Sequence, residues 1–163
     1  VQDMEKMLNE YLQFASTTSI EKTEKFDITD LIENTIKKYE NKNITLELAN
    51  AVYINGRKNL IERCINNLID NSIKYSNSIN IQLTKSSNNL TIIIDDDGPG
   101  IPKNEYKNVF KPFYKIDKSR SESKSSVGLG LSIASDAIRS HGGNITLDKS
   151  PQNGVRVKVF LPF

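Results

Sequence analysis

The stretch from Leu60 to Tyr75 constrains the fold more than any other part of the chain. Its apolar residues recur every three or four positions, which places them on one wide face of a helix. That face consists of Leu60, Ile61, Cys64, Ile65, Leu68, Ile69 and Ile73. Because so wide a face needs a broad apolar surface to cover it, the pattern predicts a long helix packed on a sheet.

The sheet is expected from segments in which apolar and polar residues alternate. These segments are 44–48, 52–54, 79–83, 90–94, 144–147 and 155–161, with a short extended piece at 26–28. A second helix is expected after a cap at Asp27 or Thr29, and a third from about Gly128 to Ser140. We therefore predict an α+β fold, a two-layer α/β sandwich in which a mixed sheet packs on three helices.

The composition excludes several classes of protein. The chain has 163 residues, of which 37% are hydrophobic and 26% charged, as in an ordinary globular domain. A net charge of +2 gives no electrostatic case for a nucleic-acid partner. One cysteine, Cys64, and one histidine, His141, argue against a disulfide framework and against a Cys/His zinc site.

The beginning of the chain has a different pattern. Met4, Leu8, Tyr11 and Leu12 form a narrow helical stripe, typical of a helix that pairs with other helices, and residues 16–19 form a polar linker. We therefore divide the chain into a helix end at 1–19 and one domain at 20–163.

Two glycine clusters have the composition of phosphate-binding or turn segments. Asp95-Asp96-Asp97-Gly98-Pro99-Gly100 follows an apolar strand, and Val127-Gly128-Leu129-Gly130-Leu131 opens a helix. Glycines at a helix start let backbone N–H groups approach an anion, although a plain turn and a plain helix entry have the same appearance. The clusters lack the features of a Walker phosphate loop, a calcium loop and a dinucleotide-binding fingerprint.

The third polar feature lies on the long helix itself. Asn67, Asn71 and Lys74 (or Tyr75) recur at spacings of four and three residues, so they share one face. Amide oxygens beside an ammonium group suit a hard cation and the phosphates that it neutralises. Such a stripe by itself is usually a solvated face, and the two glycine clusters shift the interpretation toward a site.

Taken together and in this order, these motifs resemble the ATP-binding catalytic domain of bacterial sensor histidine kinases, in the GHKL superfamily. Asn67-x-x-x-Asn71-x-x-Lys74-Tyr75 is similar to the N box of that family, and Asp96-x-Gly98-x-Gly100 to its first glycine box. Residues 110–114 resemble the F box, and 128–131 the second glycine box. The resemblance covers about Phe26 to Phe163, and residues 1–19 resemble the end of the dimerisation hairpin.

The resemblance implies a role for each matching residue on the nucleotide. Asp96 would accept the hydrogen bond of the adenine amino group, and Gly98 and Gly100 would let the chain bend close to the base. Asn71 would coordinate Mg²⁺, with Asn67 near the same phosphates as a catalytic residue. Lys74 would meet phosphate oxygens, and Tyr75 would pack along the nucleoside.

The remaining matches lie in the second half of the chain. Tyr114 and Lys115 would face the base and the phosphates, Arg120 would act catalytically, and Gly128, Leu129 and Gly130 would surround the phosphates. The simpler interpretations are turn residues for Asp95 and Asp97, loop charge for Lys115 and Arg120, and core packing for Phe110 and Phe113. Ser126 replaces the first glycine of the family's second glycine box.

The implied activity is transfer of the γ-phosphoryl group of ATP to a histidine. The chain lacks an acceptor motif, and His141 before Gly142 is expected to cap a helix, so the acceptor would lie on a dimerisation domain outside this fragment. Implied partners are that domain, a response regulator and a second copy in a homodimer. The domain would be cytoplasmic, in a protein anchored in the inner membrane. The alternatives are a GHKL-type ATPase and a non-catalytic nucleotide-binding module.

Overall fold

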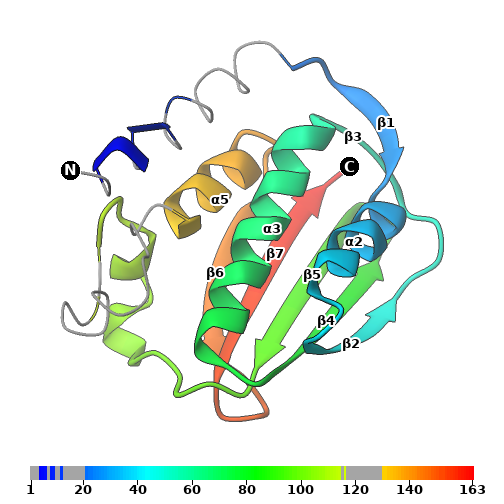
Figure 1. Ribbon diagram of the computed structural model, residues 1–163. Coiled ribbons are helices and arrows are strands. Elements are labelled where there is room, and N and C mark those ends of the chain that lie inside the picture. Colours follow the sequence, from blue (N-terminus) through cyan, green and yellow to red (C-terminus); the bar gives the residue numbers. More distant parts are fainter. Residues whose placement is uncertain (1–3, 7, 10–11, 13–20, 115, 117–129) are drawn as a thin grey trace.

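The computed structural model describes residues 4–6, 8–9, 12, 21–114, 116 and 130–163 (Figure 1). Within them, no helix combines the length and the apolar character that a membrane span requires. Met4, Leu8 and Leu12 are helical and exposed, so the predicted stripe faces solvent there. The predicted boundary between residues 19 and 20 lies outside the described residues and stays a prediction.

A five-stranded mixed sheet forms one layer of the fold. Its strands are β2 (Asn43–Leu48), β4 (Ser78–Lys85), β5 (Asn89–Asp96), β6 (Asn144–Lys149) and β7 (Val155–Pro162), in the order β2-β4-β5-β7-β6. β2 pairs with β4 in parallel, and all other pairs in this sheet are antiparallel. A separate two-stranded sheet joins β1 (Glu24–Asp27) to β3 (Tyr53–Gly56).

Three helices form the second layer. They are α2 (Ile28–Ile36), α3 (Lys58–Tyr75) and α5 (Gly130–Arg139), and they lie on the same side of the sheet in Figure 1. Short 3₁₀ turns follow α2 at Lys37–Tyr39 and occur at Lys103–Glu105 and Asn108–Phe110. The α+β, two-layer fold with a mixed sheet on three helices is therefore confirmed.

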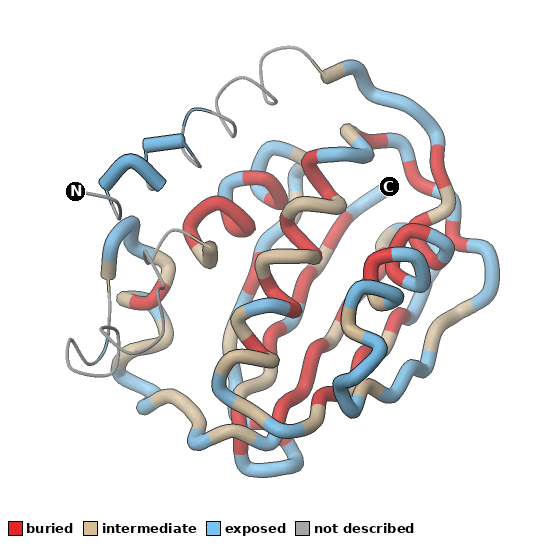
Figure 2. The backbone as a smooth tube through the Cα atoms, in the orientation of Figure 1, coloured by how far each residue is buried: buried red, intermediate tan, exposed pale blue. Residues whose placement is uncertain are grey.

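The core lies between the two layers. Ile81, Ile92 and Val157 on the sheet and Leu68 and Ile69 on α3 are each at most 2% exposed. Figure 2 shows the buried residues concentrated along α3 and on the sheet behind it. Burying one such side chain stabilises the folded state by about 1.5–3 kcal/mol, so α3 is held mainly by its apolar face.

Local signals set the boundaries of the helices at the edge of this layer. Asp27 caps α2, since its carboxylate accepts a hydrogen bond of 2.9 Å from the Thr29 N–H. Ile28, predicted as extended, is instead the first residue of α2, because the chain turns at this cap. α5 ends at Arg139, and the turn after it is closed by Gly142, which has a φ of +80°, and by the Gly143 N–H, which donates to the Ile138 carbonyl.

His141 joins the end of α5 to the start of α3. Its Nδ1–H donates to the Ala137 carbonyl at 2.7 Å, and its Nε2 accepts from the Arg57 N–H at 3.0 Å. Nε2 must be unprotonated to accept this bond. Burial and, to a smaller extent, the nearby Arg57 charge lower the pKa of His141 below its ordinary value of 6.5. The capping role expected for His141 thus includes the N-terminus of a second helix.

This pair of hydrogen bonds predicts a pH dependence of stability. Because the pKa of His141 is lower in the folded than in the unfolded state, its contribution is fully present above pH 6.5 and is lost as the pH falls through the folded pKa. We expect the unfolding free energy of the wild type to fall more steeply from pH 7 to pH 5 than that of His141→Gln, measured by urea denaturation. Parallel pH profiles for the two proteins would contradict this role.

Candidate active site

The polar stripe of α3 lies on the half-buried flank of the helix, beside the apolar face that packs on the sheet. Asn67, Asn71 and Lys74 are each of intermediate exposure, and Tyr75 is 39% exposed. No hydrogen bond of the Asn67 or Asn71 side-chain amide to any described residue occurs. Neither amide is therefore used to hold the fold together through a hydrogen bond within the described part of the chain.

The first turn of α5 faces this stripe. A Cβ placed on Gly130 would lie 4.0 Å from the Cβ of Asn67, so the end of the second glycine cluster is in contact range of α3. The two helices are also linked where the Cys64 thiol donates to the Ala134 carbonyl at 3.6 Å. Packing of α3 against α5 thus brings together two motifs that are more than 50 residues apart in the sequence.

Asp96 is a buried carboxylate at the end of β5. It is 4% exposed, and its Oδ1 accepts hydrogen bonds from the Gly98 and Val155 N–H groups, both at 3.0 Å. No described residue donates a hydrogen bond to Oδ2. Burial raises the pKa of Asp96, and the two N–H groups oppose this shift. The carboxylate is thus fixed through one oxygen, and no described residue donates to the other.

The loop after Asp96 packs directly on the end of α3. A Cβ on Gly98 would lie only 2.5 Å from the Tyr75 carbonyl oxygen, so this contact requires glycine. A cavity of about 430 Å³ lies at this junction. Its lining residues are Lys74, Tyr75, Ser76, Asn77, Asp97, Gly98 and Pro99. The cavity therefore adjoins residues of the N-box stripe and of the first glycine cluster.

The other two aspartates of the cluster have structural partners. Asp95 was expected in a turn, but it lies on β5 and pairs with Arg156 of β7 through two hydrogen bonds of 2.7 and 2.9 Å. The expectation was wrong because the strand extends to Asp96, and β7 supplies the arginine opposite Asp95. Asp97 accepts hydrogen bonds from the Asn77 and Ser78 N–H groups, which lower its pKa.

The F-box region is only partly described. Phe110 packs against the core as expected, whereas Phe113 is 56% exposed and has a φ of +65°, so core packing is wrong for Phe113. The Tyr114 hydroxyl donates to the Glu105 carboxylate, which raises the pKa of Tyr114. Tyr114 does not line the cavity. Lys115, Arg120, Gly128 and Leu129 lie outside the described residues.

Gly154 is a further residue of this region that the sequence did not single out. A Cβ there would lie 2.1 Å from Asp96 Oδ1 and 2.3 Å from the Asp96 carbonyl oxygen. Its successor, Val155, supplies one of the two N–H donors to Asp96. The sequence signal was a glycine in the turn before the last strand, which is too common a feature to indicate a site.

Gly154→Ala should lower the unfolding free energy by about 1–3 kcal/mol, because the added methyl group overlaps backbone and carboxylate atoms that cannot both move away. Gly130→Ala is the matched control, since its methyl group would meet no atom of the described residues closer than the Asn67 Cβ at 4.0 Å. Urea denaturation of the two variants measures the difference. Equal stability of Gly154→Ala and the wild type would mean that the turn accommodates a side chain.

Comparison with known proteins assigns this arrangement to a family. Residues 56–163 match the family described as histidine kinase-, DNA gyrase B-, and HSP90-like ATPase. Sensor histidine kinase CpxA of Escherichia coli K12 is 34% identical over 108 residues, which cover 66% of this chain and 24% of CpxA. Sensor histidine kinase GtrS of Pseudomonas aeruginosa is 29% identical over 98% of this chain and 33% of its own length.

Solved structures have the same fold. The ATP-binding domain of PrrB from Mycobacterium tuberculosis superposes with a TM-score of 0.72 at 25% identity, covering 86% of this chain and 96% of PrrB. Full-length ShkA in complex with AMPPNP gives a TM-score of 0.80 at 19% identity, covering 97% of this chain and 35% of ShkA.

The chain spans about a quarter to a third of the length of CpxA and GtrS. The family match nevertheless covers more than half of the chain and includes the N-box stripe, the Asp96 loop and Gly154. The chain therefore belongs to the family of histidine kinase-, DNA gyrase B- and HSP90-like ATPases, as an ATP-binding catalytic domain of the sensor histidine kinase type.

Proposed function

We propose that this domain binds Mg-ATP between α3, the Asp96 loop and the start of α5, and transfers the γ-phosphoryl group to a histidine of a dimerisation domain. The observation that carries the proposal is the placement of a buried carboxylate with one unused oxygen beside a helix flank with two unused amides. A carboxylate or amide oxygen that no described residue binds can accept a hydrogen bond from a ligand or coordinate a cation, and these oxygens lie on the two elements that meet at the cavity.

Asp96 is the proposed reader of the base. Its Oδ2 would accept the hydrogen bond of the adenine amino group, while the Gly98 and Val155 N–H groups hold Oδ1 in place. Gly98 and Gly100 would let the loop run close to the base, and Tyr75, which lines the cavity, would pack its ring along the nucleoside. ShkA, which has a similar fold, was crystallised with AMPPNP, an ATP analogue.

Asn71 is the proposed ligand of Mg²⁺, through its amide oxygen. The described residues contain no cluster of three His, Cys, Asp or Glu side chains that could hold a metal ion by itself. An amide oxygen together with nucleotide phosphates fits the preference of Mg²⁺ for a few protein oxygens. When bound, the ion neutralises phosphate charge, and Lys74 adds a positive charge from the next turn of α3.

The remaining proposed contacts come from the family resemblance, and the position of Gly130 against Asn67 supports those of the second glycine cluster. Backbone N–H groups of Gly128, Leu129 and Gly130 would bind phosphate oxygens at the helix start. Lys115 would bind phosphate, and Tyr114 would have to leave Glu105 to reach the base. Arg120 would stabilise the charge that develops on the transferred group.

Transfer to histidine is favoured over hydrolysis by Asn67. The position one helical turn before the proposed magnesium ligand is the place for a general base that activates water, and a neutral amide cannot take up a proton. In the proposed reaction a histidine nitrogen attacks the γ-phosphorus, the bond to the β–γ bridging oxygen breaks, and ADP leaves with that oxygen. Positioning and charge neutralisation are sufficient for such a transfer.

The partners belong to the same proposal. The acceptor histidine would lie on the dimerisation domain of a homodimeric protein, and the phosphoryl group would pass next to an aspartate of a response regulator. The domain would work on the cytoplasmic side of a protein anchored in the inner membrane. The sensor histidine kinases CpxA and GtrS, which are several times longer than the region matched here, motivate these assignments.

Isothermal calorimetry of Mg-ATP binding to Asp96→Asn and Asp95→Asn tests the proposal. Loss of a charge-assisted hydrogen bond at a buried site costs about 1.5–3 kcal/mol, so Asp96→Asn should bind ATP roughly tenfold to a hundredfold more weakly. Asp95→Asn changes the adjacent residue, which pairs with Arg156. It should lower the stability and leave the affinity for ATP unchanged.

Two outcomes of this experiment would count against the proposal. No heat of binding with a folded wild-type sample would rule out the nucleotide site. Equal ATP affinity of Asp96→Asn and the wild type would reduce Asp96 to a structural residue of the turn.

Asn71→Ala and Arg120→Ala separate binding from transfer. Asn71→Ala should make ATP affinity independent of magnesium, measured by calorimetry with and without the ion, and should abolish transfer to an added histidine-bearing hairpin. Arg120→Ala should slow transfer with nearly native ATP affinity, because its interaction forms mainly in the transition state. Transfer by Arg120→Ala at the wild-type rate would make this arginine an ordinary surface charge.

A further inference from the structure

Helix α3 has no cap of its own at its N-terminus. Arg57 occupies the N-cap position, and its side chain makes no capping hydrogen bond. The first N–H groups of any helix have no partner within the helix, and side chains such as Asp, Asn, Ser or Thr at the N-cap usually bind them. The helix that carries the candidate nucleotide ligands therefore depends on other segments at this end.

Glu21 supplies the missing cap from a distant part of the chain. Its Oε1 accepts hydrogen bonds from the Asn59 N–H at 2.8 Å and the Leu60 N–H at 3.3 Å, across 38 and 39 positions of sequence. These are the second and third residues after Arg57, the positions that a local cap would bind. The carboxylate also places a negative charge at the positive end of the helix dipole.

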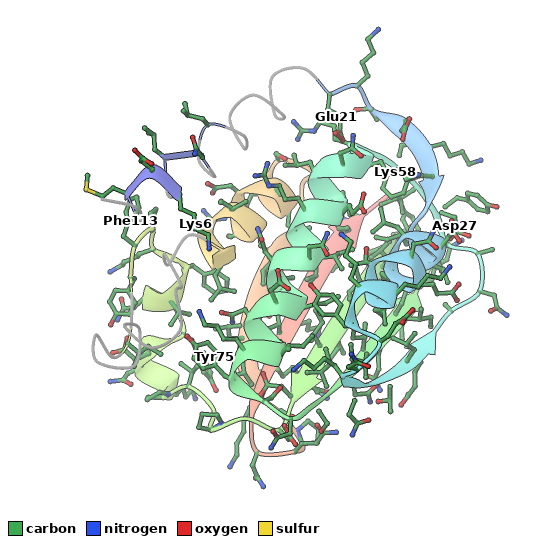
Figure 3. All side chains as sticks on the ribbon, viewed as in Figure 1. Lys6, Glu21, Asp27, Lys58, Tyr75 and Phe113 are labelled. Carbon is green, nitrogen blue, oxygen red and sulfur yellow. The ribbon has the colours of Figure 1, made fainter. Side chains whose placement is uncertain are left out.

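The environment of Glu21 indicates that its carboxylate makes a specific contact and is not simply an exposed surface charge. Its Oε2 is buried and has no hydrogen-bond partner among the described residues, so the carboxylate has given up water to reach this position. Figure 3 shows Glu21 at the Lys58 end of α3, with Tyr75 at the opposite end of the same helix. His141 accepts from the Arg57 N–H, so the two side chains together bind three of the four N–H groups from Arg57 to Leu60, all but that of Lys58.

We infer that Glu21 fastens the chain entering the domain to the N-terminus of α3 and so fixes the direction of entry. Three residues after Glu21, β1 begins and pairs with β3, which leads into α3 through Gly56. The segment between Glu21 and Glu24 is therefore held at both ends, by the cap and by the sheet.

This inference concerns the attachment of the chain and does not depend on the proposed nucleotide chemistry. Glu21 is a positioning residue, at the end of α3 opposite to the cavity. Its removal should loosen the entering segment without removing any group from the candidate site. We therefore expect Glu21→Ala to bind Mg-ATP as the wild type does.

A double-mutant cycle with Arg57→Asp tests the capping contact. Loss of a helix cap typically costs about 1 kcal/mol, so Glu21→Ala should raise the unfolding equilibrium constant about fivefold. Arg57→Asp introduces a carboxylate at the N-cap itself, and in that background Glu21→Ala should have an effect below about twofold. Glu24→Ala, an exposed glutamate of the same segment, is the matched control and should change the constant by less than about twofold.

NMR relaxation distinguishes fastening from stability alone. In Glu21→Ala the heteronuclear NOEs of the Lys22 and Thr23 amides should fall, and the local cap of Arg57→Asp should restore stability without restoring these NOEs. Glu21→Gln keeps an acceptor oxygen and should retain most of the NOE, which provides a second test should Arg57→Asp not fold.

Each outcome of these experiments supports or contradicts the capping role or the fastening role of Glu21. Native stability of Glu21→Ala, or a destabilisation that persists in full in the Arg57→Asp background, would overturn the capping role. Native NOEs at Lys22 and Thr23 in Glu21→Ala would overturn the fastening role. Destabilisation that the local cap removes, with NOEs that it does not restore, supports both.

Discussion

Burial of one face of α3 on the sheet is the interaction on which the rest of this structure depends. The face is covered by strands β4, β5 and β7, whose inward side chains are almost fully buried. Because a helix repeats every 3.6 residues, fixing this face also fixes the direction of the flank that bears Asn67 and Asn71. The candidate ligands are thus oriented by apolar packing and not by bonds of their own.

The Asp96 loop shows how the fold keeps a carboxylate buried without using all of its hydrogen-bonding capacity. Two backbone N–H groups bind one oxygen, and Gly98 and Gly154 provide the close backbone approach that brings those donors within reach. Burial raises the pKa of Asp96 and the N–H groups oppose this. The neighbouring Asp95 forms an ion pair with Arg156 instead. Of these two adjacent carboxylates, one therefore stabilises the sheet and the other is held by backbone N–H groups.

The N-terminus of α3 has a comparable arrangement at the opposite end of the helix. There the N–H groups are bound by Glu21, which precedes the domain's first strand, and by His141, which follows α5. One helix therefore touches the entering chain at its start and the cavity at its end. α3 is therefore the element that connects the Glu21 contact at its N-terminus to the cavity at its C-terminus.

The sequence by itself determined whatever depends on local spacing. The helical stripe of α3, the alternation of the strands, the Asp27 cap and the order of the N-box and glycine motifs are all properties of neighbouring residues, and they sufficed for the fold class and the family resemblance. The Asp96 assignment also came from such a motif. Its burial and its unused oxygen could not be predicted, because they depend on where β7 lies.

Only the tertiary structure decided the contacts between distant segments. The motif singled out Asp96 from Asp95, but only strand pairing put Arg156 opposite Asp95 and Gly154 against Asp96. Phe113 was apolar enough for the core, but it lies in a turn with a positive φ and its side chain is exposed. Glu21 was an ordinary charge in a polar segment until folding placed it 2.8 Å from an N–H 38 residues away. Such contacts follow from packing and chain closure, and no local pattern encodes them.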